Sequence, residues 1–121
     1  MKRINILINN LKFEAELNDT KTAEKIYELL PIEAEGNLWG NEIYFEIPLE
    51  MENENPTENL KVGDLAYWSE GNSLCIFYGR TPVSENDAPK PASPVTIVGQ
   101  IKGNIDELKK LKEVKIKIIK I

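Results

Sequence analysis

The chain has 121 residues, a length that suits one domain whose core is large enough to fold without disulfides or metals. Its net charge of −5 is uneven, because residues 1–60 are strongly acidic and residues 61–121 mildly basic. Because its middle has no cluster of basic residues, the chain is expected to bind nucleic acid poorly. No apolar run is long enough to cross a membrane. We therefore predict a single domain over 1–121, with neither nucleic acid nor membrane as partner.

Two features of the composition exclude several kinds of catalytic and metal site. Histidine is absent and Cys75 is the only cysteine, which excludes Ser-His-Asp and Cys-His catalysis, cysteine or histidine zinc sites and intrachain disulfides. No phosphate-binding glycine motif occurs, and the glutamates of 46–54 lack the spacing of a calcium loop. We expect no metal and no cofactor. Cys75 lies in an apolar run, where a buried, unreactive thiol is expected.

The N-terminal third predicts two strands and a helix. Residues 3–8 and 11–17 have the pattern of a hairpin joined by Asn9–Asn10, since asparagine tolerates the positive φ of tight turns. This N-terminus has too short an apolar run for a secretory signal, so we predict a cytoplasmic protein. Residues 18–20 offer N-caps for a helix that Pro31 ends. Its apolar face is predicted to cover the sheet and consists of Ala23, Ile26, Tyr27 and Leu30.

The remainder predicts further strands separated by two long loops. Residues 38–47 predict one strand, followed by an acidic loop, and 63–82 predict a hairpin around the turn at 70–72. Neither strand of this hairpin alternates cleanly with polar residues, so both of its faces are expected to be covered. Four prolines make 80–94 a long loop. A strand over 94–103, a short helix after Asn104 and a strand over 113–121 complete the chain.

The number and spacing of these elements favour a mainly β fold. Seven or eight short strands, mostly linked as hairpins, indicate an antiparallel barrel or sandwich rather than a parallel sheet. Of these two, we predict a closed antiparallel barrel with two short helices covering its ends.

Four motifs carry a resemblance to a known family. The segments 63–68, 71–77 and 95–103 are similar to the second half of a cyclophilin. More closely, the whole chain resembles a small prokaryotic group of cyclophilin-like proteins whose function is not established. The matching motifs are N-x-W-G-x-E-I-Y-F at 37–45, G-D-x-A-Y-W at 63–68, L-C-I-F-Y-G-x-T-P at 74–82 and A-S-P-V at 92–95. This resemblance implies a closed eight-stranded barrel with two helices.

The resemblance does not extend to the catalytic residues of cyclophilins. Prolyl isomerisation by cyclophilins uses an arginine that hydrogen-bonds the prolyl nitrogen and so lowers a rotation barrier of roughly 18–20 kcal/mol. The matching strand is 43–47, in which Glu46 stands at or near the arginine position, and Leu74 replaces a supporting glutamine. A carboxylate cannot act as that cationic donor, so conventional isomerase activity is doubtful. Whether the chain is an enzyme stays open.

Aromatic and polar residues near these motifs are the candidate ligand-binding residues. Aromatic walls with a few polar groups are typical of ligand pockets, although each aromatic could instead belong to the core. We predict a non-catalytic domain that binds a peptide or a small metabolite. The alternatives are a weak or altered prolyl isomerase, with its cation supplied from elsewhere in the chain, and a structural or oligomerisation domain such as a homodimer. The candidates are Trp39, Glu42, Tyr44, Glu46, Trp68, Ser73, Phe77, Tyr78 and Arg80.

Overall fold

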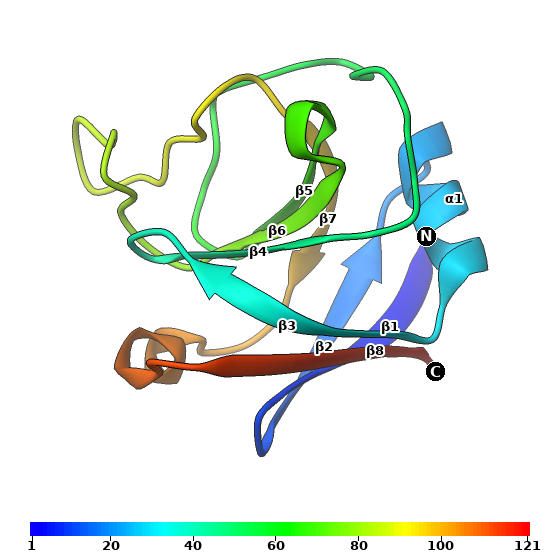
Figure 1. The fold of residues 1–121 in the computed structure, drawn as a ribbon, viewed down its shortest axis with the longest axis horizontal. Coiled ribbons are helices and arrows are strands. Elements are labelled where there is room, and N and C mark those ends of the chain that lie inside the picture. The colour runs from blue at the N-terminus through cyan, green and yellow to red at the C-terminus, as the bar shows by residue number, and fades with distance from the viewer.

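The computed structural model describes residues 1–121 and contains eight strands, one α-helix and two 3-10 turns (Figure 1). The first five elements are β1 (Lys2–Ile8), β2 (Leu11–Leu17), α1 (Lys21–Leu29), β3 (Ile32–Leu38) and β4 (Glu42–Glu46). The others are β5 (Asp64–Trp68), η1 (Ser69–Gly71), β6 (Ser73–Phe77), β7 (Thr96–Ile101), η2 (Asp106–Lys110) and β8 (Val114–Lys120). No helix is long and apolar enough to cross a bilayer.

The eight strands form a closed antiparallel barrel, as predicted. Their order around the barrel is β1-β2-β7-β5-β6-β4-β3-β8, and β8 closes it by pairing with β1. Successive side chains of a strand point to opposite faces, so Ile4, Ile6 and Ile8 of β1 all point inward and are buried. These three isoleucines belong to a cluster of 24 buried hydrophobic residues, which forms the main core.

The predicted N-terminal hairpin and helix are confirmed. Asn9 has a φ of 54° in the turn between β1 and β2. Thr20 caps α1 by accepting a hydrogen bond from the Ala23 N–H at 3.1 Å. The helix ends before the cis peptide bond Leu30–Pro31 and lies against β2 and β7. The second predicted helix is the 3-10 turn η2, five residues long, which buries Leu108.

The strand predicted within 38–47 is β4, but it begins only at Glu42, and the strand before it, β3, was not predicted. β3 ends at Leu38, the chain turns at 39–41, and β4 begins at Glu42. β3 was not predicted because its sequence contains few large apolar residues. Its partly buried face carries Ala34 and Gly36, and a Cβ at Gly36 would lie 2.6 Å from Val114 Cγ2. Small residues are therefore required where β3 packs against β8.

Two long loops pass outside the sheet formed by β4, β6, β5 and β7 (Figure 1). Segments 48–62 and 80–95 meet in an isolated bridge between Thr57 and Val95. Tyr67 anchors the first loop by donating its hydroxyl to the Leu49 carbonyl at 2.5 Å. Beneath the loops lies a second hydrophobic cluster, separate from the main core, made of Leu60, Ala66, Cys75, Phe77 and Val95.

Candidate functional site

A pocket of about 220 Å³ opens on the outer face of the barrel, beside the second hydrophobic cluster. Strands β4, β5 and β6 supply one wall, and the loop at 91–95 supplies the opposite wall. Seven of its nine lining residues are hydrophobic. The lining residues are Trp39, Glu42, Tyr44, Trp68, Cys75, Phe77, Pro91, Ala92 and Val95.

Strand register explains why a hollow forms at this place. Tyr44 of β4 stands opposite Cys75 of β6, and Cys75 stands opposite Ala66 of β5. In the next row, Glu42 stands opposite Phe77. The two small side chains, at Cys75 and Ala66, leave space between larger aromatic neighbours. All of these residues point away from the barrel interior, because side-chain direction alternates along each strand.

Trp39 and Glu42 are brought together by the tight turn between β3 and β4. The Trp39 N–H donates to the Glu42 carbonyl at 2.9 Å, and the Glu42 N–H donates to the Trp39 carbonyl at 3.2 Å. Gly40 takes a φ of +57° at the first turn position, where hairpin turns favour glycine. A Cβ at Gly40 would lie 2.8 Å from Pro82 Cδ, so the turn packs closely against the chain after β6.

Trp68 is held in place by contacts on several sides. Its indole Nε1–H donates to Ser93 Oγ at 2.7 Å, and the Ser93 hydroxyl donates to Glu70 Oε2 at 2.6 Å. Its ring meets the Tyr44 ring edge-on, with 6.4 Å between the two centroids. It also covers Gly71 so closely that a Cβ at position 71 would lie 2.4 Å from Cζ3 of Trp68. The wall formed by Trp68 is therefore built into the fold before any ligand arrives.

Glu42 is the one acidic residue in the pocket, and one of its two carboxyl oxygens has no hydrogen-bond partner. The residue is 5% exposed, and Oε1 is buried without a hydrogen-bond partner. Burial raises the pKa of Glu42 to about 7, and a hydrogen bond with the Cys75 thiol opposes that rise. No lysine or arginine lines the pocket. One oxygen of the buried Glu42 carboxyl therefore has no partner within the chain.

Cys75 forms the floor of the pocket as a buried thiol, as its apolar surroundings predict. Burial and the neighbouring Glu42 charge raise the pKa of this thiol well above its usual range. A reactive thiolate needs the opposite surroundings, with positive charge nearby. Cys75 therefore acts here by its small size and not as a nucleophile.

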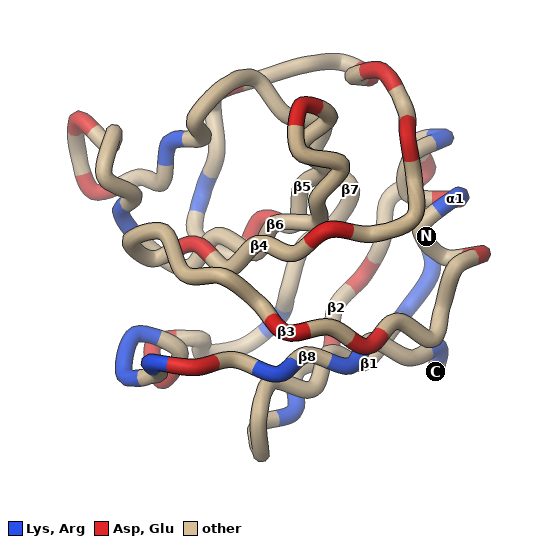
Figure 2. The backbone as a smooth tube through the Cα atoms, viewed as in Figure 1, with Lys and Arg blue, Asp and Glu red and all other residues tan.

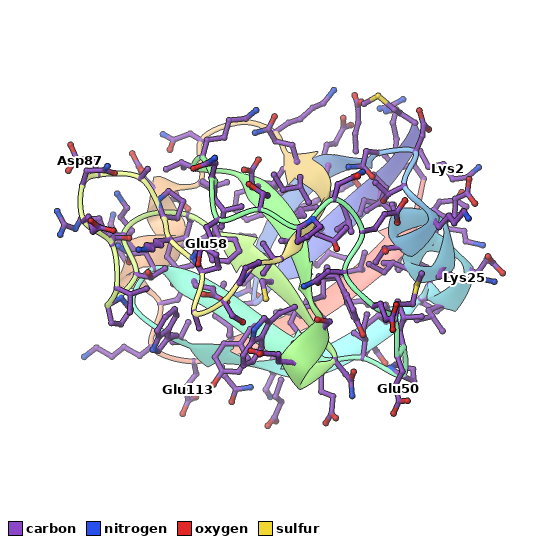
Figure 3. All side chains as sticks on the ribbon, turned by 90° about the horizontal axis from the view of Figure 1, so that it is seen from above. Lys2, Lys25, Glu50, Glu58, Asp87 and Glu113 are labelled. Carbon is purple, nitrogen blue, oxygen red and sulfur yellow. The ribbon has the colours of Figure 1, made fainter.

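Five of the candidate residues line this pocket, and four lie elsewhere. Tyr78 is buried in the main core, and Ser73 is buried and donates to the Gly71 carbonyl at 2.8 Å. Glu46 is exposed at the end of β4. Arg80 is exposed, 3.4 Å from the Ser84 carbonyl and 4.0 Å from Asp87, which lies at one end of the molecule (Figure 3). The five lining residues are Trp39, Glu42, Tyr44, Trp68 and Phe77.

The loop residues Pro91, Ala92 and Val95 were not among the candidates, although they line the pocket. The A-S-P-V motif at 92–95 was the available signal, since it marks a distinctive segment of otherwise irregular loop. No group of three or more acidic or cysteine side chains is placed to hold a metal ion.

These features define a domain built as a closed eight-stranded antiparallel barrel, with a small aromatic pocket on the outside of its wall. The profile of the Cyclophilin-like family matches residues 2–120, so the chain belongs to this family, as its motifs predict. It is similar to the solution structure of the hypothetical protein AF2241 from Archaeoglobus fulgidus, with a TM-score of 0.82 and 31% identity. That match covers 99% of this chain and 95% of the other. No curated protein matches the chain.

Proposed function

We propose that this domain binds a small ligand in the pocket without transforming it. The observation that carries the proposal is the buried, unpartnered Glu42 carboxyl among aromatic walls. Apolar linings with a few oriented polar groups are the usual composition of ligand sites. Benzene fills a cavity of roughly 150 Å³. The pocket of about 220 Å³ therefore suits a small metabolite or a single side chain of a peptide.

Two observations favour this function over its alternatives. An isomerase of the cyclophilin kind needs a cation at the substrate, but no basic side chain lines the pocket. Arg80 instead contacts Ser84 and Asp87 within its own loop. An association domain would be expected to expose an apolar patch. The large hydrophobic residues that are exposed include no aromatic, being Met1, Leu38, Val62, Val83 and Ile121.

The test is a thermal-shift screen of small molecules and short peptides against the protein and two loop variants. Ala92→Phe places a ring at the pocket opening, and Ala88→Phe places the same ring at an exposed position of the same loop outside the pocket. A ligand at saturating concentration is expected to raise the Tm by several degrees in the wild type and in Ala88→Phe, because it binds only the native state. Ala92→Phe is expected to abolish the shift.

A shift that persists in Ala92→Phe, or no shift with any compound, would overturn the proposal. A prolyl-isomerisation assay run alongside Arg80→Ala tests the enzymatic alternative, which predicts wild-type activity that the variant loses. Light scattering at several protein concentrations tests the homodimer, for which we expect a monomer mass throughout.

A further inference from the structure

We infer that the ligand is a small organic cation, a protonated amine that donates an N–H to Glu42 while its hydrocarbon body packs against the aromatic walls. This inference rests on the proposed function and names the chemical class of its ligand. Three observations carry it: the surroundings of Glu42, the aromatic residues that line the same pocket, and the absence of basic residues from that lining.

Glu42 differs from the other buried acid of the chain because one of its carboxyl oxygens, Oε1, has no internal partner. Asp64 is equally buried, but its carboxylate accepts hydrogen bonds from the Lys61 N–H at 2.8 Å and from the Gln100 amide at 3.3 Å. Glu42 Oε1 accepts none. Leaving a buried acceptor unsatisfied is unfavourable, so an N–H from a bound molecule would stabilise this oxygen.

The remainder of the lining favours a positively charged donor. The pocket that contains the acid is also lined by Trp39, Tyr44, Trp68 and Phe77. The faces of aromatic rings attract cations, most strongly when the site excludes water. Glu70, in the turn between β5 and β6, adds a negative charge beside this wall, because its carboxylate accepts a hydrogen bond from Ser93, the partner of Trp68 (Figure 2). This charge favours the approach of a cation and opposes that of an anion.

The same lining excludes ligands that carry their own acid or several polar groups. With no lysine or arginine in the pocket, the carboxylate of an amino acid or the phosphate of a nucleotide would be buried without a partner. A sugar would bury several hydroxyl groups against hydrophobic side chains. A compact amine with an apolar body brings a donor for Glu42 and carries no acid or acceptor that the lining would leave without a partner.

Cation binding should also depend on pH. The Cys75 thiol lies beside Glu42, and the Glu42 charge also acts on the Tyr78 hydroxyl in the main core. Burial raises the pKa of both groups, so they stay uncharged. The Tyr44 phenol also lines the pocket. Glu42 itself has a pKa of about 7. An alkylammonium prefers the ionised carboxylate, so its affinity should rise as pH increases through neutrality.

The experiment compares three probes with the same ring but different heads: cyclohexylmethylammonium, cyclohexylmethanol and cyclohexanecarboxylate. The chain has two tryptophans, Trp39 and Trp68, and both line the pocket, so intrinsic fluorescence reports binding there. At about pH 8 the ammonium is expected to bind at least about tenfold more tightly than the alcohol, and the carboxylate not at all. At about pH 5.5 the preference for the ammonium is expected to shrink.

Two matched variants assign the effect to one carboxyl group. Glu42→Gln is expected to abolish the preference for the ammonium while leaving the alcohol bound. Glu46→Gln changes an exposed acid two residues further along β4 and is expected to preserve that preference. The pH dependence of the wild type is a second test that needs no variant.

Equal affinity for ammonium and alcohol, or a preference that survives in Glu42→Gln, would overturn the inference. If the alcohol binds as well as the ammonium and Ala92→Phe blocks both, the domain still binds ligands and only the cation is wrong. If none of the three probes binds, the cation inference fails, and the broader screen decides separately whether the pocket binds anything.

Discussion

The Glu42 carboxyl has a pKa of about 7 in the folded chain, against an ordinary value of 4.5. The native state therefore binds this proton more tightly than the unfolded state, and stability falls as pH rises between those two values. The difference corresponds to about 3 kcal/mol lost above neutrality. Glutamine has no proton to lose, so the free energy of unfolding of Glu42→Gln should rise relative to that of the wild type as pH increases. Between about pH 4.5 and about pH 8 the relative gain should reach up to about that amount.

Urea unfolding at several pH values checks this expectation. Glu46→Gln is the control, because it removes an exposed acid from the same strand and should follow the wild-type curve. If the stability of Glu42→Gln changed with pH in parallel with that of the wild type, the buried carboxyl would not lose stability on ionising, and the expectation would be contradicted.

The contact between Trp68 and Gly71 gives a second prediction at the scale of one residue. A Cβ at position 71 would lie 2.4 Å from the indole ring, and the hydrogen bond to Ser93 leaves that ring little freedom to move. Gly71→Ala should displace Trp68, break its hydrogen bond and shift its fluorescence emission to the red as water reaches it. Unchanged emission and unchanged ligand affinity would show that the ring adapts.

Side-chain alternation accounts for which candidate residues could be identified from sequence. Within β6 the odd positions, such as Cys75 and Phe77, point out of the barrel, while Leu74 and Ile76 point in. Alternation alone could therefore have placed Phe77 at the site. It does not place Pro91 or Ala92, because a loop has no fixed period and its path over the sheet depends on tertiary contacts.

Helix α1 depends on a side chain from a distant loop. Glu54 accepts hydrogen bonds from the Lys21 and Thr22 N–H groups, each at 3.1 Å, at the end of the helix where N–H groups lack partners. These bonds lower the pKa of Glu54, so its stabilising effect is present above the unfolded pKa and is lost as pH falls through the folded value. Glu54→Ala should therefore lower the Tm at neutral pH.

Glu52→Ala is the matched control for that prediction, since Glu52 is exposed in the same loop. Thermal unfolding should show a lower Tm for Glu54→Ala than for Glu52→Ala at neutral pH, and the difference should decrease in acid. An equal Tm for the two variants would show that the cap from this loop contributes nothing.

Strand β3 shows what sequence patterns miss at the scale of an element. Its longest pairing is with β8, so its partner lies about eighty positions further along the chain. Beyond Ile32, its inward face carries the small residues Ala34 and Gly36, which match the crowded wall at Val114. Local periodicity detects large apolar residues, and it therefore found β1, β2 and β6 but not a strand defined by its partner.

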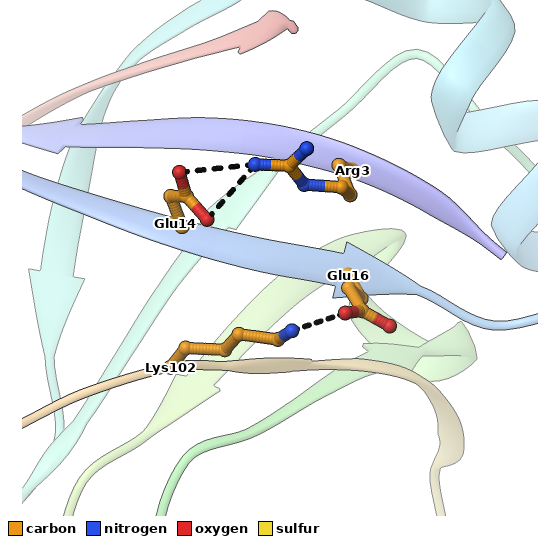
Figure 4. A network of polar contacts seen from close by, with 4 residues as sticks. All are labelled: Arg3, Glu14, Glu16 and Lys102. Carbon is orange, nitrogen blue, oxygen red and sulfur yellow. Dashed lines mark hydrogen bonds and ion pairs between the residues drawn. The ribbon is translucent and has the colours of Figure 1, made fainter.

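At the scale of the whole molecule, closure of the barrel depends on the seam between β2 and β7. The ion pair Glu16–Lys102 spans this seam, while Arg3–Glu14 joins β1 to β2 (Figure 4), and exposed pairs of this kind contribute little to stability. The close backbone approach at Gly99 is the stricter requirement, because a Cβ there would lie 2.2 Å from the Glu16 carbonyl oxygen.

Gly99→Ala should therefore force β2 and β7 apart and cost about 3 kcal/mol, at the upper end of overpacking penalties. Gly103→Ala is the comparison, since no atom lies within 4 Å of a Cβ there and only its φ of +86° is unfavourable, at about 1 kcal/mol. Chemical denaturation of both variants measures the difference. If the two variants lost equal stability, the close approach of β2 and β7 at Gly99 would not be the cause of the loss.

The separation of the two hydrophobic clusters has a consequence for protein engineering. The barrel wall divides the side chains that hold the fold together from those that line the pocket, and both sets alternate along the same strands. Outward positions such as Tyr44 can be redesigned while their inward neighbours, such as Ile43 and Phe45, stay in place. The domain is thus a scaffold in which ligand preference and stability can be varied on opposite sides of one sheet.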